Sequence, residues 1–114
     1  MYQSEAKYHI EQRLPNRLIE SLHEMEKKYR DKGIRLFIFG SFARSQDRQT
    51  SDLDLGVQWI GKRSSKIFSN LCRDVHKLPT IRKIDVVDME QVDEGFKNKA
   101  MEEAIFIWQG EKVL

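Results

Sequence analysis

A helix-forming segment separates the second and third of three β-type runs in this chain of 114 residues. The runs span Ile34–Phe39, Leu53–Trp59 and Lys83–Met89, and turn-forming residues lie next to them. A mixed α/β sheet with helices packed on it requires strands that are joined through a helix in this way. We therefore expect an α/β (α+β) fold with a mixed β-sheet of three to four strands. The segment Ile105–Trp108 closes the domain as a short strand or as a helix end.

Apolar residues at helical spacing predict the helices that pack on this sheet. In a helix over about residues 11–32, which Gly33 ends, these positions are Leu14, Leu18, Ile19, Leu22, Met25 and Tyr29. A second helix begins after Ser64, which can cap it, and stops before Pro79. Its apolar residues are Ile67, Phe68, Leu71, Cys72 and Val75, and we expect Cys72 to be buried.

A last helix is expected from about Val92 or Asp93 to Ala104. Between the first two strands, residues 42–51 are polar and predict a short helical turn and a loop. Phe42 is the apolar exception in this stretch. It should contribute to the core together with the apolar residues of the first strand.

Length and composition indicate one ordinary globular domain, which we expect at residues 11–114, with residues 1–10 loosely held. The 20 basic and 18 acidic residues nearly cancel, so direct nucleic-acid binding is not indicated. Cys72 is the only cysteine and residues 1–5 lack an apolar signal, which favours a reducing cytoplasm. The longest apolar run, residues 36–39, is far shorter than the roughly 20 residues of a membrane span.

The residues that indicate chemistry lie at the ends of the first two strands. Gly40 and Ser41 follow the first strand directly. Glycine lets backbone amides approach a phosphate, and a serine hydroxyl can donate to the same anion. Asp52 and Asp54 stand two positions apart on one face of the second strand, with Cα atoms about 6.5 to 7 Å apart. Such a carboxylate pair suits Mg²⁺ or Mn²⁺, which also bind substrate phosphate oxygens.

A third carboxylate is usually needed to hold two metal ions about 3.5 to 4 Å apart for phosphoryl transfer. Asp85, near the start of the third strand, is the candidate. Asp88 lies on the same strand, but three positions away, which places it on the opposite face. Only one of these two residues can face Asp52 and Asp54.

Gly40–Ser41, the intervening residues 42–51 and Asp52-Leu53-Asp54 resemble the signature of the DNA polymerase β-like nucleotidyltransferase superfamily. Ile84-Asp85-Val86-Val87 resembles its third-carboxylate strand, and the resemblance extends over residues 34–108. In its small size and its sequence Gly-Ser-Phe-Ala-Arg, the chain is most similar to the minimal nucleotidyltransferase (MNT) branch. The resemblance implies a polymerase β palm-like fold and a metal-dependent enzyme that moves a nucleoside monophosphate onto an acceptor hydroxyl.

The resemblance also implies a role for each residue of the motif. Asp52 and Asp54 would hold two Mg²⁺ ions, and Asp85 would complete one metal site and help to deprotonate the acceptor hydroxyl. Gly40–Ser41 would cradle the β and γ phosphates of ATP. Arg44 would touch the triphosphate, although a solvent-exposed or structural role for it stays open.

The acceptor is expected to come from another protein, because we expect no room in this chain for the helical acceptor domain of larger relatives. In the minimal branch the resemblance implies a partner, an all-helical HEPN protein that acts as an RNA-cleaving toxin. The leading hypothesis is an antitoxin that transfers AMP from ATP to a tyrosine hydroxyl of this toxin. Two alternatives stay open: neutralisation by complex formation without catalysis, and transfer to a small molecule such as an aminoglycoside.

Overall fold

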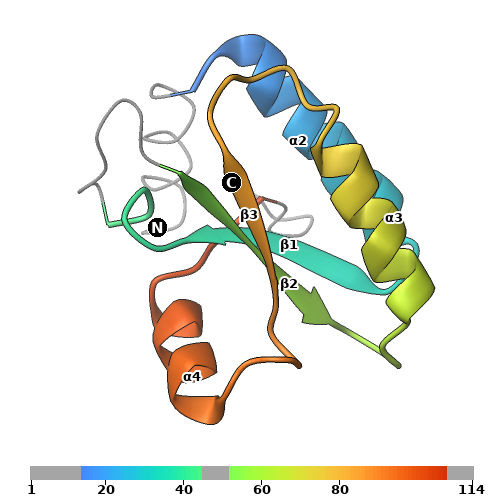
Figure 1. The fold of residues 1–114 in the computed structure, drawn as a ribbon, viewed down its shortest axis with the longest axis vertical. Helices are drawn as coiled ribbons and strands as arrows, with labels where there is room; N and C mark the ends of the chain where they lie inside the picture. The colour runs from blue at the N-terminus through green and yellow to red at the C-terminus, as the bar shows by residue number, and fades with distance from the viewer. Residues whose placement is uncertain (1–13, 45–51, 108–114) are drawn as a thin grey trace, which may run out of the picture.

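The computed structural model describes residues 14–44 and 52–107 of the chain (Figure 1). Its elements are α2 (Asn16–Arg30), β1 (Ile34–Phe39), β2 (Leu53–Trp59), α3 (Ser65–Val75), β3 (Ile84–Asp88), α4 (Glu94–Glu102) and β4 (Ile105–Phe106). The first two strands have the predicted bounds. The predicted start of the first helix, residues 1–10, most of the expected loop at 42–51, and Trp108 lie outside the described residues.

The four strands form one mixed sheet in the order β3-β2-β1-β4. β1 is antiparallel to both β2 and β4, whereas β2 and β3, which α3 connects, are parallel. The predicted mixed α/β sheet is therefore confirmed, with Ile105–Phe106 as its fourth strand. The register places Asp54 opposite Phe39 on one side and opposite Asp85 on the other.

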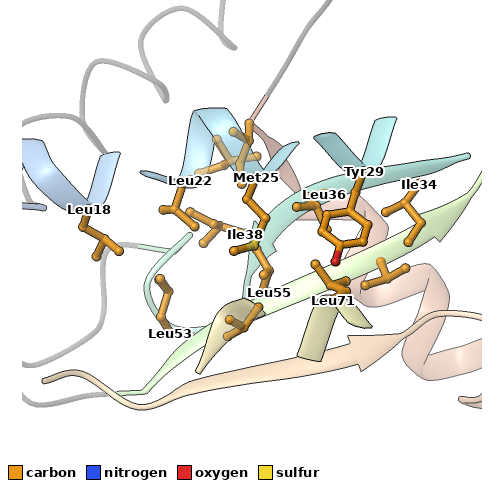
Figure 2. Packing of buried hydrophobic residues seen from close by; sticks show 14 of the residues in the cluster. Leu18, Leu22, Met25, Tyr29, Ile34, Leu36, Ile38, Leu53, Leu55 and Leu71 are labelled. Atoms are coloured by element: carbon orange, nitrogen blue, oxygen red, sulfur yellow. The ribbon is translucent and has the colours of Figure 1, made fainter. Parts of the chain in front are cut away.

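The helices cover the two faces of the sheet unequally, with α2 and α3 against one face and α4 against the other (Figure 1). Successive strand residues alternate between these faces. The larger apolar cluster lies under α2 and α3, as Figure 2 shows for Leu18, Leu22, Met25, Tyr29, Ile34, Leu36, Ile38, Leu53, Leu55 and Leu71. The buried residues of the smaller cluster on the α4 side are Phe37, Phe39, Met89, Ala100 and Ala104. Phe42 belongs to the larger cluster, as predicted.

Side-chain caps set the starts of α3 and α4. Ser64 Oγ accepts a hydrogen bond from the Ile67 N–H at 3.2 Å, and Asp93 Oδ1 accepts one from the Phe96 N–H at 2.8 Å. The Ser64 cap was predicted, and the Asp93 cap lies at the approximate start expected for the last helix. The prediction that Cys72 is buried was wrong, since it is half-buried. It lies to one side of the face through which Leu71 and Val75 enter the core.

A polar contact fastens α2 to α3 on the covered face. The Tyr29 hydroxyl donates to Asp74 Oδ2 at 2.6 Å, and Lys28 Nζ lies 2.9 Å from the same oxygen. Burial raises the pKa of the Tyr29 hydroxyl, and the hydrogen bond to Asp74 raises it further. No helix in the described part of the chain has the length and apolar character of a membrane span.

Candidate active site

The turn after β1 places a glycine directly against an aspartate of β2. Gly40 has a φ of 80°, in the left-handed region, and its carbonyl accepts a hydrogen bond from the Arg44 N–H at 3.1 Å. A Cβ atom at position 40 would run into the Asp54 carboxylate. Phe42 anchors the turn in the core, where only 1% of it is exposed. Both backbone conformation and space therefore require glycine at this position.

The three aspartates of the predicted site lie at one edge of the molecule, where β2 and β3 begin. Asp52 is exposed just before β2, whereas Asp54 is half-buried and is the register partner of Asp85 on β3. Burial raises the pKa of the Asp54 carboxyl, and the negative charges of Asp85 and Asp52 raise it further. The three carboxylates are therefore close enough to interact electrostatically.

The donor chemistry of these residues fits a divalent cation. Carboxylate oxygens are the protein ligands that Mg²⁺ prefers, and a cation would offset the burial and the repulsion that together raise the pKa of Asp54. Within residues 14–44 and 52–107, no three acidic, histidine or cysteine side chains are gathered closely enough to hold a metal. Asp85 Oδ1 instead lies 3.7 Å from Lys83 Nζ. The carboxylates that a divalent cation prefers are therefore present, but in the described residues they are not close enough together to bind one ion jointly.

A pocket of about 530 Å³ opens beside Asp54, between the Gly40 turn and α4. Its described lining is Phe39, Gly40, Ser41, Arg44, Asp54, Val87, Phe96, Lys99, Ala100 and Glu103. The volume is within the range of about 300 to 1,000 Å³ that is usual for small-molecule sites. Four of the predicted site residues meet in this lining, while Asp52 and Asp85 do not belong to it.

Glu103, at the end of α4, is a pocket residue that the sequence did not indicate. Its Oε1 accepts hydrogen bonds from the Gly40 N–H and from Arg44 Nη1, each at 3.0 Å, and its Oε2 lies 2.8 Å from the same Arg44 nitrogen. Gly40 and Glu103 are 63 positions apart, so no local pattern could reveal the contact. Arg44 lines the pocket with its guanidinium paired to Glu103.

The structure assigns Asp88, the alternative to Asp85, to a different environment. Asp88 is 5% exposed and accepts hydrogen bonds from Trp59 Nε1 at 3.0 Å and from Arg63 Nε at 2.6 Å. It lies at the far end of β3 from Asp85, beside Val57. Its surroundings are those of a buried structural anchor.

The comparison with protein families decides the class of the chain. Residues 20–112 match the model described as Polymerase beta, Nucleotidyltransferase. The chain belongs to this nucleotidyltransferase family. The match covers most of the sequence, and it confirms the enzyme class and the fold predicted from Gly40–Ser41 and the aspartates. A comparison with curated proteins found no match.

Two solved structures resemble the fold of this nucleotidyltransferase. One is a crystal structure of a toxin–antitoxin with AMP-PNP, with 15% identity and a TM-score of 0.60 over 82% of this chain and 75% of that chain. The other is the toxin–antitoxin MntA-HpeT with two aspartate-to-glutamate substitutions two positions apart. It has 14% identity and a TM-score of 0.61 over the same shares. At these identities the similarity shows the fold alone.

Proposed function

We propose that this nucleotidyltransferase is the antitoxin of a HEPN toxin–antitoxin pair. It transfers AMP from ATP to a tyrosine hydroxyl of the ribonuclease toxin and thereby inactivates it. The observation that carries the proposal is the position of Asp54, which lies beside Asp85 in the sheet and against the Gly40 turn at the pocket. Toxin–antitoxin structures of the same fold, one with AMP-PNP, support the nucleotide and the acceptor class.

The polar end of the pocket would receive the triphosphate. The Ser41 hydroxyl would donate to a phosphate oxygen, and Gly40, without a side chain, leaves room beside the Asp54 carboxylate for the β and γ phosphates. Lys99 lines the same pocket and adds positive charge for the phosphates, and Arg44 lies beside it with its guanidinium held by Glu103.

Asp52, Asp54 and Asp85 are the residues that would hold two Mg²⁺ ions. When bound, the ions supply the charge that polarises the α-phosphate and stabilises the leaving pyrophosphate. Because Asp54 lies against the Gly40 turn in the pocket and is the register partner of Asp85, it is the residue best placed to hold a metal beside the phosphates.

The transfer forms one phosphorus–oxygen bond, breaks another and moves one proton. The tyrosine oxygen of the toxin attacks the α-phosphorus of ATP, while the hydroxyl proton passes to the Asp85 carboxylate. The bond between the α-phosphorus and the oxygen that bridges to the β-phosphate then breaks. The products are tyrosine-linked AMP and pyrophosphate. Asp85 is half-exposed at the edge of the sheet, where an acceptor on another protein can approach it.

Labelled ATP tests this proposal directly. The chain is incubated with Mg²⁺ and a HEPN protein found encoded next to its gene, using ATP labelled at the α-phosphate and, in parallel, ATP labelled at the γ-phosphate. We expect the α label on a tyrosine of the toxin, no γ label, and loss of ribonuclease activity. A toxin that is inhibited without label would contradict the transfer and favour neutralisation by complex formation.

Substitutions separate catalysis from binding in the same assay. Asp54→Ala should abolish labelling and leave the complex with the toxin intact. Asp31→Ala, which removes an exposed aspartate at the end of α2, is the matched control and should label normally. Retained neutralisation by Asp54→Ala would contradict the catalytic mechanism.

A further inference from the structure

The pocket has an apolar end as well as a polar end. Phe39, which directly precedes Gly40, lines it together with Val87 and Phe96, and the Phe96 ring lies beyond Phe39 at the start of α4. Phe96 is 45% exposed, one of three large apolar side chains that are exposed in the described residues. The other two, Ile60 and Ile81, are not part of the pocket lining. Phe96 is therefore the exposed apolar surface that a bound ligand in this pocket would cover.

Phe96 is held in a fixed position by its surroundings. Its N–H donates to the Asp93 cap at 2.8 Å, which fixes its backbone in the first turn of α4. Its ring meets the ring of Phe39 edge-on, with centroids 6.0 Å apart and planes at 85°. Phe39 is itself buried at the end of β1. Because the buried Phe39 ring holds it in place, the exposed Phe96 ring offers a pre-organised surface for stacking.

The face of α4 that lines the pocket spans the distance between its two ends. Phe96, Lys99 and Glu103 lie at successive turns along this face. Glu103 contacts the Gly40 turn, and Phe96 lies seven residues earlier, about 10 Å away along the helix axis. This span is comparable to the separation between the phosphates of a nucleotide and its base.

We propose that Phe96 forms the nucleobase subsite of this enzyme, where the base of the nucleoside triphosphate stacks on the phenyl ring. The inference rests on the proposed function, since it takes the Gly40–Ser41 end of the pocket as the phosphate site. Stacking of a base on an aromatic ring accepts every base because each has a π-face, and the larger purines bury more area. The subsite therefore favours ATP and GTP over CTP and UTP.

Comparing a ligand that has a base with one that lacks it distinguishes binding at the base subsite from binding at the phosphate site. Binding of ATP and of inorganic tripolyphosphate, which lacks a base, is measured by calorimetry with Mg²⁺ for the wild-type chain and three variants. Phe96→Ala removes the ring, Phe96→Tyr keeps it, and Ile81→Ala removes an exposed apolar side chain outside the pocket lining. The melting temperature of each variant reports whether it is folded.

We expect Phe96→Ala to weaken ATP binding by about 10- to 100-fold and to leave tripolyphosphate binding unchanged. Phe96→Tyr and Ile81→Ala should bind ATP like the wild type. If a folded Phe96→Ala variant binds ATP as tightly as the wild type, the subsite is wrong while the proposed function stands. Equal loss of ATP and tripolyphosphate would also overturn stacking. A wild-type chain that binds neither ligand contradicts both proposals.

Discussion

The Glu103 carboxylate accepts a hydrogen bond from the Gly40 N–H at 3.0 Å and fastens the end of α4 to the turn that follows β1. Because it pairs with Arg44 as well, one side chain fixes two positions of the predicted phosphate-binding segment. The glutamate is mostly enclosed, with 17% of its side chain exposed. The α4 helix therefore forms one wall of the pocket and also sets the shape of the opposite wall.

Removal of this contact should loosen the turn. We expect Glu103→Ala to lower the free energy of unfolding by about 1 to 2 kcal/mol, because the Gly40 N–H and the Arg44 guanidinium lose their shared acceptor. The Michaelis constant for ATP should rise. Glu102→Ala, at the exposed neighbouring position, is the control and should change neither quantity. Chemical denaturation and steady-state kinetics measure the two effects, and an unchanged Michaelis constant in Glu103→Ala would argue against this role.

Two glycines with left-handed backbones provide a second test. Gly33→Ala has open space around its new Cβ, so it should cost about 1 to 2 kcal/mol of stability for the backbone conformation alone. Gly40→Ala has the same conformational cost and also drives its Cβ into the Asp54 carboxylate. We expect it to be less stable than Gly33→Ala and to lose nucleotide binding, which Gly33→Ala keeps. Equal stability and binding in the two variants would show that the close approach of Gly40 to Asp54 is unimportant.

The two aspartates of β3 should respond in opposite ways to the same substitution. Asp85→Asn should reduce nucleotidyl transfer by at least about 100-fold through loss of the base, with little change in stability at this half-exposed position. Asp88→Asn should lower the free energy of unfolding by about 3 kcal/mol, because Arg63 loses its partly buried ion pair. Transfer assays below the melting temperature should find Asp88→Asn active. If Asp88→Asn instead lost transfer activity while Asp85→Asn lost stability, Asp88 would be the catalytic residue and Asp85 the structural one.

The sequence predicted the elements of this fold well because their signals are local. β1 and β2 are compact runs beside turn residues, and Ser64 and Asp93 mark helix starts through caps only three residues long. The opposite faces of Asp85 and Asp88 followed from strand alternation.

The rest of the site depends on tertiary contacts that no local pattern records. Glu103 reaches Gly40 from the far end of the described chain, and Phe96 becomes a pocket residue only because α4 folds back over the sheet. The partner of Arg44 was missed for the same reason. Cys72 was assigned to the core from spacing alone, whereas the buried residues of α3 are Leu71 and Val75, and Cys72 lies beside them and is half-buried.

The charge of Asp54 should make the metal-free protein less stable at neutral pH than a variant that lacks it. Burial, and then Asp85 and Asp52, raise the pKa of this carboxyl in the folded state, so the folded chain binds more protons than the unfolded chain between the two pKa values. The free energy of unfolding contributed by Asp54 therefore falls as the pH rises through this window, and the loss persists above it.

We expect Asp54→Asn to raise the free energy of unfolding at about pH 7 in the presence of a chelator, with the gain shrinking towards about pH 4. Glu24→Gln changes the net charge equally at an exposed site of α2 and should give no such gain. Urea denaturation at the two pH values measures the difference, and an Asp54→Asn variant that is less stable than the wild type at neutral pH would contradict the electrostatic strain assigned to this site.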